Sequence, residues 1–257
     1  MRFFITLSYD GTRYHGWQIQ PNGDTIQQRL QEALSTILRQ PVEVIGAGRT
    51  DTGVHARMMV AHFDIDPQMS TVNSKPSTVN SKPSTINNLS YKLNKLLPPD
   101  IAVQEVRQVA DDMHARFSAT SRTYHYYIHT YKDPFIAAYS WQIPFKLDFE
   151  KMNEAAKVLL EYKDFTSFSK VNTDTKTNLC DIKEAYWEEV SQGRWRFTIT
   201  ANRFLRNMVR AIVGTLVEVG RGRLTTEDVR RIIEAKDRCQ AGDSVHGKAL
   251  FLVSIKY

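Results

Sequence analysis

The stretch VEVIGAGRTDTGVHARMMVAHFDI (residues 42–65) contains two apolar runs that flank a glycine-rich loop. The β-branched run Val42–Ile45 and the longer run Arg57–Ile65 each predict a strand. The loop GAGRTDTGVHAR (residues 46–57) has three glycines, which allow tight turns and close approach of another group to the backbone. The stretch therefore predicts two strands of a sheet that aim the side chains of the loop between them.

The rest of the chain alternates between strand and helix patterns. Period-2 runs predict strands at Arg2–Tyr9, Ile101–Val109, Ser121–Thr130, Ile182–Val190, Trp195–Thr200 and Leu250–Ile255. Apolar stripes predict helices at Thr25–Gln40, Ile86–Leu97, Phe149–Leu160, Phe204–Val219 and Thr225–Lys236. This order, with its hairpins, predicts an α+β fold with a mixed, mainly antiparallel sheet. We expect two similar subdomains, at residues 1–110 and 111–257, that share one long central sheet.

A near-exact tandem repeat follows the second strand of the opening stretch. STVNSKP occurs twice, at residues 70–76 and 77–83, and STINNLS follows at 84–90. The first two copies have few apolar groups to bury and are too short to be solenoid units. We expect a flexible surface insertion at residues 70–85, after which the third copy grades into a helix.

Composition and charge limit the class of protein. Hydrophobic residues make up 42% of the 257-residue chain, which is enough for a core, and Lys+Arg 34 against Asp+Glu 28 gives a net charge of +6. This charge is compatible with a polyanionic partner but does not require one. The two cysteines, Cys180 and Cys239, do not form a C-x-x-C pair, as expected for a reducing compartment. With no signal-peptide layout and no apolar run of roughly 20 residues, we expect a cytoplasmic protein.

Asp51 is the one acid of the glycine-rich loop, and two interpretations of it stay open. An Asp before Thr-Gly is typical of a side chain that caps its own turn. Alternatively, Arg49 and Arg57 hold the carboxylate ionised, and it acts as a nucleophile or a base. The loop lacks the Gly-Lys-Ser/Thr ending of a P-loop and the helix start of a dinucleotide fingerprint. Asp64 and Asp66 lie at the far end of the next strand, so a catalytic carboxylate pair is not favoured.

The segment SRTYHYYIHT (residues 121–130) combines aromatic and basic side chains. Strand alternation places Arg122, Tyr124 and Tyr126 on one face and Thr123, His125 and Tyr127 on the other. One face must be core, whereas a tyrosine beside an arginine on the other is suited to stacking on an unpaired base. The scattered histidines, His55, His62, His125 and His129, lack acidic or thiol partners, which favours surface or core roles over metal binding.

The helix predicted from Phe204 has the clearest periodicity. Its apolar face is Phe204, Met208, Ile212 and Leu216, while Arg203, Arg206 and Arg210 gather opposite. These arginines form either a solvated basic face or a groove that follows phosphates. Gly214 continues the arginine stripe and indicates that another backbone approaches there.

Four motifs together resemble the tRNA pseudouridine synthase A family. They are YDGTRYHGWQIQ (9–20), GRTDTGVHA (48–56), HARFSATSRTYHYYI (114–128) and NRFLRNMVRAIVG (202–214). Their order and spacing are similar to the family along nearly the whole chain. Two departures stand out: Thr52 replaces the usual alanine, and the heptapeptide insertion is atypical.

The resemblance implies an isomerase without cofactor or metal that converts uridines 38, 39 and 40 of the tRNA anticodon stem-loop to pseudouridine. It implies that Asp51 is the nucleophile, that Arg49 displaces the base, and that Arg210 pairs with the aspartate. Tyr124 would contact the target base, and we expect Arg122, Arg203 and Arg206 to bind the substrate as well. It also implies a homodimer with a catalytic cleft between the two halves and helices on one side of the sheet. A catalytically silent tRNA-binding protein on the same scaffold is the alternative.

Overall fold

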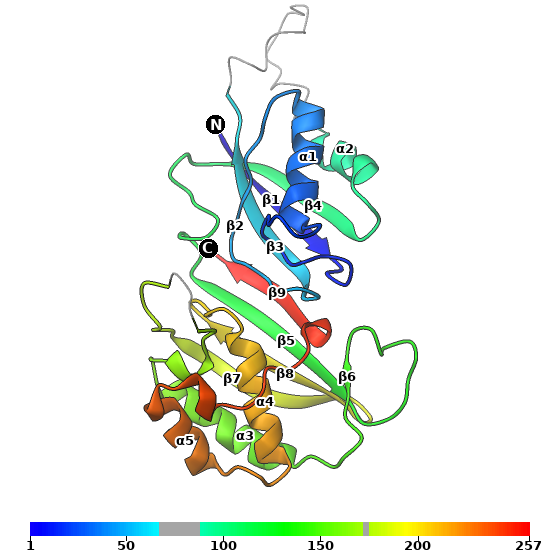
Figure 1. The fold of residues 1–257 in the computed structure, drawn as a ribbon. Coiled ribbons are helices and arrows are strands. Elements are labelled where there is room, and N and C mark those ends of the chain that lie inside the picture. The colour runs from blue at the N-terminus through cyan, green and yellow to red at the C-terminus, as the bar shows by residue number, and fades with distance from the viewer. Residues whose placement is uncertain (67–87, 172–174) are drawn as a thin grey trace, which may run out of the picture. The chain divides into compact units, whose positions relative to one another are not determined.

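The computed structural model describes residues 1–66, 88–171 and 175–257 (Figure 1). The chain divides into two compact units, residues 1–119 with Tyr257 and residues 120–256. Each unit combines helices with mainly antiparallel strands, which confirms the α+β prediction. The repeat insertion predicted at residues 70–85 lies outside the described residues. No helix within the described part of the chain has the length and apolar character needed to cross a membrane.

The N-terminal unit is a sheet with two helices. Its strand order is β4-β1-β3, with the short β2 also paired to β3, and every pairing is antiparallel. β1 is buried in the middle, and its Phe3 ring stacks on Phe63 of β3. The helices lie side by side on one side of this sheet (Figure 1). The elements are β1 (Arg2–Tyr9), α1 (Ile26–Leu38), β2 (Ile45–Gly46), β3 (His55–Asp64), α2 (Leu89–Leu96) and β4 (Ile101–Val109).

The apolar stripes of both helices face the core, with one exception. Thr25 caps α1 by accepting a hydrogen bond from the Gln28 N–H, and Leu30 and Leu34 are fully buried. In α2, Leu93 is buried, but Leu96 is 50% exposed. The helix ends at Leu96, so the next leucine leaves in an extended conformation and takes the buried position instead.

The strand predicted at Val42–Ile45 is mostly wrong, because β2 contains only Ile45 and Gly46. Side chains of α1 take up the backbone groups of this segment. The Val44 N–H donates to Gln31 Oε1 at 3.0 Å, and the Val44 carbonyl accepts from Gln27 Nε2 at 2.7 Å. A backbone bonded to helix side chains cannot also form a ladder, so only its last residues pair with β3.

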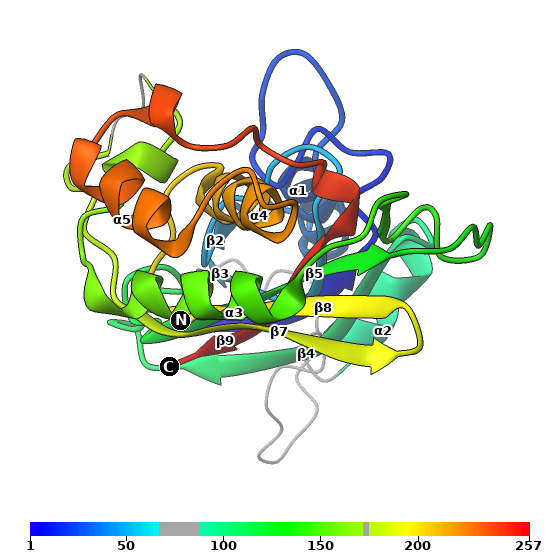
Figure 2. The same cartoon turned by 90° about the horizontal axis from the view of Figure 1, so that it is seen from below.

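The strands of the C-terminal unit follow the order β9-β5-β8-β7 with antiparallel pairing, and β6 adds in parallel beside β5. The three helices of this unit lie on one side of these strands (Figure 2). The Phe149 ring stacks there on the Trp195 ring, with the ring centroids 3.5 Å apart. Thr225 and Asp228 form a capping box at the start of the last helix. The elements are β5 (Ser121–His129), β6 (Trp141–Gln142), α3 (Phe149–Val158), β7 (Ile182–Ser191), β8 (Arg194–Ala201), α4 (Met208–Gly220), α5 (Thr226–Ala235) and β9 (Leu250–Lys256).

The predicted helix from Phe204 begins later and is more buried than expected. Asn207 adopts a left-handed conformation with φ 68°, so α4 starts only at Met208, and Arg203 and Arg206 precede the helix. Only Arg210 and Glu218 of α4 are not buried, so the predicted basic helix face is wrong. The close approach at Gly214 is confirmed, because a Cβ there would lie 1.9 Å from the Asp243 carbonyl oxygen.

Candidate active site

Thr50 anchors the loop that carries Asp51 through contacts to two other residues. Thr50 is only 7% exposed, and its hydroxyl lies 2.8 Å from the hydroxyl of Tyr9 at the end of β1. Its carbonyl accepts from the Trp17 N–H at 3.1 Å. Next to Thr50, which is fixed through both side chain and backbone, Asp51 is half-buried, and Arg49 is exposed. The loop therefore presents a carboxylate and a guanidinium on a fixed support.

Two glycines of the YDGTRYHGW segment allow this support to form. A Cβ on Gly11 would lie 2.1 Å from the Val54 carbonyl oxygen, and one on Gly16 would lie 2.4 Å from the Thr50 carbonyl oxygen. Gly16 also has φ +91°, a conformation that side chains disfavour. The backbone of the segment therefore contacts the backbone of the Asp51 loop on both sides of Asp51.

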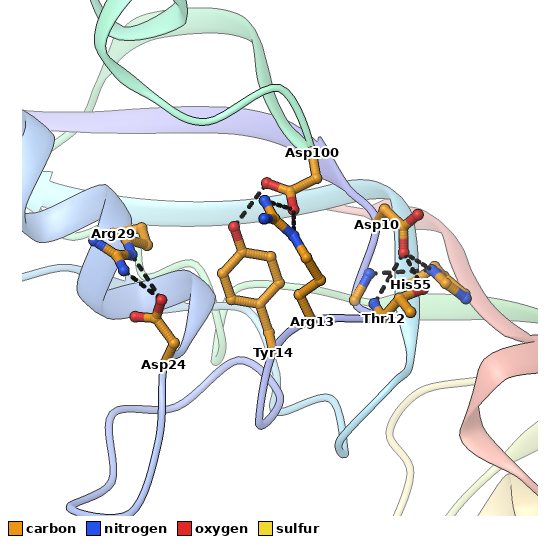
Figure 3. A network of polar contacts seen from close by, with 9 residues as sticks. Asp10, Thr12, Arg13, Tyr14, Asp24, Arg29, His55 and Asp100 are labelled. Carbon is orange, nitrogen blue, oxygen red and sulfur yellow. Dashed lines mark hydrogen bonds and ion pairs between the residues drawn. The ribbon is translucent and has the colours of Figure 1, made fainter.

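Asp10 and His55 connect the same two segments through their side chains (Figure 3). His55 is 2% exposed, and its Nδ1 lies 3.0 Å from Asp10 Oδ1 and 3.1 Å from the Gly11 nitrogen. An unprotonated Nδ1 accepts from the Gly11 N–H, whereas a protonated one donates to Asp10. Asp10 Oδ1 also accepts from the N–H and hydroxyl of Thr12, at 2.9 and 2.5 Å. We call this Asp10–His55 contact the loop clamp.

A second set of contacts fixes the segment to the start of β4 (Figure 3). Asp100 accepts from the Tyr14 hydroxyl at 2.7 Å and from Arg13 Nε at 2.7 Å, while its carbonyl accepts from the Asp10 N–H at 2.9 Å. Burial of the phenol, followed by its hydrogen bond to Asp100, raises the pKa of Tyr14. The support under the Asp51 loop is thus anchored at several independent points.

In the C-terminal unit, the structure brings two of the sequence motifs into contact. The half-buried Tyr124 ring packs edge to face on Phe204, with centroids 5.2 Å apart. Arg122 Nη1 donates to the Asn202 carbonyl at 2.6 Å. Arg122 and Tyr124 share a face with the fully buried Tyr126, so this is the face that the helices cover.

Arg210 is anchored by the chain that precedes β9. Its Nε donates to the Val245 carbonyl at 2.6 Å, and the side chain is half-buried. Burial raises the pKa of Tyr126, and the positive charge of Arg210 opposes that rise. Arg203 is half-buried and Arg206 is exposed, both in the turn before α4. The predicted site residues thus fall into two groups, with Arg49 and Asp51 in the N-terminal unit and the others in the C-terminal unit.

The loop clamp was not predicted from the sequence. Asp-Gly-Thr at residues 10–12 indicated a turn, and nothing in its spacing pointed to His55 as its partner. His55, His62 and His129 are buried, as expected for core histidines. Among the described residues, no group of three or more histidine, cysteine or acidic side chains is placed to hold a metal ion. Thr52, the departure within the loop, is exposed, so its hydroxyl does not disturb the buried support.

Comparison with known sequences decides the family. The family model described as tRNA pseudouridine synthase matches residues 5–118 and 155–257. The chain belongs to this family. It is 58% identical to a tRNA pseudouridine synthase A of Bacteroides thetaiotaomicron, over 100% of this chain and 90% of that protein. It is 57% identical to the Bacteroides fragilis protein of the same name, over 100% and 96%, and 38% identical to that of Bacillus subtilis, over 100% and 99%. The matched ranges include every predicted site residue except Tyr124 and Arg122, which the pairwise comparisons cover.

Proposed function

We propose that this protein converts uridines 38, 39 and 40 in the anticodon stem-loop of tRNA to pseudouridine, with Asp51 as the nucleophile. As a member of the tRNA pseudouridine synthase family, it is an isomerase that acts on uridine in tRNA. The observation that supports Asp51 is its place in the loop. It is half-buried and directly follows a threonine that is fixed by its side chain and by its backbone.

The reaction suits a single carboxylate. Uracil must be detached from C1′, rotated and rejoined through C5, and the hydrogen at C5 leaves when the new bond forms. The carboxylate either adds to the base or assists loss of the C1′–N1 bond, and in both routes it is released at the end. Since the product is an isomer of the substrate, no second acid is needed to activate a water molecule. A lone acid on a rigid loop is therefore sufficient.

The other residues have roles in binding and in exposing the base. Arg49, exposed next to Asp51, displaces the target base and contacts its phosphate. Tyr124 contacts the extruded base, and Phe204 holds its ring in place. Arg210 is the second catalytic arginine, and Arg122, Arg203 and Arg206 bind the RNA. Extruding a nucleotide costs a few kcal/mol, which contacts of this kind offset.

We also propose that the protein acts as a homodimer in the cytoplasm. Sedimentation velocity tests the assembly: a species with twice the mass of the chain is expected, and a single monomeric species at micromolar concentration contradicts it.

Substrate tRNAs with one uridine at position 38, 39 or 40, and cytidine at the other two, test the proposed specificity. After incubation, chemical labelling of pseudouridine followed by reverse transcription maps the product. We expect a stop at each of the three positions and none in a tRNA that lacks all three uridines. Modification confined to uridines outside the anticodon stem-loop contradicts the proposed target. No modification of any tRNA supports the silent binding protein instead.

A further inference from the structure

The segment after β4 forms a turn that is fixed by its own hydrogen bonds. His114 Nδ1 accepts from the N–H groups of Arg116 and Phe117, at 3.1 and 3.3 Å. The His114 N–H donates to the Ser118 hydroxyl at 2.9 Å, and the Ser118 N–H returns to the His114 carbonyl at 2.9 Å. A turn with this many internal bonds holds its side chains in a defined direction.

The turn is joined to the core through a series of rings. The buried His62 of β3 accepts from the Ala115 N–H at Nδ1, and its ring lies 4.5 Å from that of His114. The His114 ring in turn lies 4.4 Å from the ring of Phe117. Burial lowers the pKa of both histidines, and the positive charge of Arg2 adds to this effect. Phe117 therefore rests on the half-buried imidazole of His114, which in turn packs on the buried His62.

Phe117 is exposed despite this support. It is 76% exposed, whereas the other phenylalanines of the N-terminal unit, Phe3, Phe4 and Phe63, are at most 2% exposed. The guanidinium of Arg116 lies over its ring, 5.6 Å from the centroid. A large apolar ring that is rigidly held in water, beside a cation, is typical of a binding surface.

The charges around the turn are compatible with an anionic partner. Asp111 is engaged, because it accepts from the Arg2 N–H and lies 3.9 Å from the terminal ammonium group. Asp112 is exposed on the same segment, and Arg116 is the cation nearest to the ring. An aromatic ring beside an arginine is the combination that RNA-binding proteins use to stack an unpaired base while attracting its phosphate.

The turn is distant from the catalytic loop. His62, which supports it, lies seven residues after His55 on β3. At the rise of a β-strand this corresponds to roughly 24 Å. A base on Phe117 is therefore a different nucleotide from the uridine at Asp51.

We propose that Phe117, with Arg116 beside it and His114 beneath it, is a stacking site for an unpaired nucleobase of the tRNA substrate, remote from the reacting uridine. This rests on the proposed function of the chain as a tRNA-modifying enzyme. Because the site touches no reacting atom, it contributes to substrate binding and not to the chemical step.

Steady-state kinetics of tritium release from tRNA labelled at uridine C5 test the proposal. For Phe117→Ala we expect KM to rise roughly 5- to 100-fold, as loss of one stacked base predicts, with kcat within about twofold of wild type. Phe117→Trp restores KM because it keeps a flat aromatic ring. Phe117→Leu behaves like the alanine variant because it keeps only the apolar volume. Tyr91→Ala is the matched control: Tyr91 is 64% exposed with Lys95 over its ring at 5.6 Å, but it lies on the open surface of α2, and its loss leaves KM unchanged.

Three results overturn the proposal. An unchanged KM in Phe117→Ala shows that the ring does not contact the substrate. A full effect that Phe117→Trp does not correct, or that Phe117→Leu does correct, shows that stacking is not the interaction. A change in sedimentation of Phe117→Ala without tRNA shows that a second copy of the chain covers the ring. A failure of the proposed function is distinct from all three, because wild type itself then releases no tritium.

Discussion

Asp10 Oδ1 and His55 Nδ1 lie 3.0 Å apart, and they connect the turn after β1 to the end of the loop that carries Asp51. The two residues are 45 positions apart in the chain, and their contact joins the segment that follows Asp51 to the turn after β1. We infer that the geometry of the nucleophile depends on this contact.

Two substitutions of Asp10 distinguish the role of its negative charge from that of its hydrogen-bonding shape. Asp10→Ala removes the acceptor for Thr12 and the partner of His55, and we expect a loss of about 2 kcal/mol in the free energy of unfolding in urea. We also expect kcat to fall about 10-fold or more with little change in KM, since small displacements of a reacting group are costly. Asp10→Asn keeps an acceptor and adds a donor, so it should retain most of both quantities. Equal kcat in wild type and Asp10→Ala would show that the clamp does not position Asp51.

Glycine-to-alanine variants compare two positions near the same loop. Gly11→Ala places a methyl group 2.1 Å from the Val54 carbonyl oxygen, while a methyl on Gly48 has no neighbour within 4 Å. We expect Gly11→Ala to lower the unfolding free energy by about 2–4 kcal/mol, in the range of buried steric defects. Gly48→Ala should change it by less than about 0.5 kcal/mol. Comparable urea midpoints for the two variants would contradict the close approach.

Tyr124→Phe tests whether the tyrosine acts on the substrate or only packs. Phenylalanine keeps the edge-to-face contact with Phe204, so the unfolding free energy should change by less than about 1.5 kcal/mol. We expect kcat/KM for tRNA to fall about 10-fold, because the hydroxyl no longer contacts the target base. Tyr124→Ala should reduce both activity and stability. Full activity of the phenylalanine variant would restrict the role of Tyr124 to packing.

His62 predicts a pH dependence of stability. Burial, followed by the charge of Arg2, lowers the pKa of His62 to about 4 from its usual value of 6.5. A lowered pKa means that the unfolded chain binds the proton more tightly, so stability is full above pH 6.5 and is lost between pH 6.5 and 4. The loss is about 2–3 kcal/mol.

Urea unfolding at several pH values between 4 and 8 measures this loss. His62→Asn keeps an acceptor for the Ala115 N–H but does not titrate, so its unfolding free energy should fall less than that of wild type as the pH is lowered. Parallel curves for wild type and His62→Asn would show that another group causes the acid loss.

The sequence predicted the elements better than their polar contacts. β1 and β4 have the predicted bounds, because alternation over eight or nine residues is a strong local signal. The failures occurred where long-range contacts decide the structure. Val44 is not part of a strand because side chains of α1 bind its backbone. The helix α4 begins four residues later than predicted because Asn207 is left-handed. Neither side-chain bonds between distant segments nor a left-handed residue can be read from periodicity.

The same limit applies to the site. Resemblance to the family predicted roles for Asp51, Arg49, Tyr124 and Arg210. Spacing alone also allowed Asp51 to be a turn cap and the arginines near residue 210 to be a solvated basic face. Asp10, Thr50 and His55 were missed as supporting residues because their contacts span about 40 residues or more of sequence. Phe117 lay within a quoted motif, but only its exposure in the folded chain distinguishes it from a core residue.

The assignment of Asp51 is tested most directly by single-turnover tritium release from tRNA labelled at uridine C5, since formation of the new carbon–carbon bond expels that hydrogen. Wild type should release tritium, and Asp51→Ala and Asp51→Asn should release none above background while still binding tRNA. Release by Asp51→Ala at a rate similar to wild type would contradict the assignment of this residue as the nucleophile.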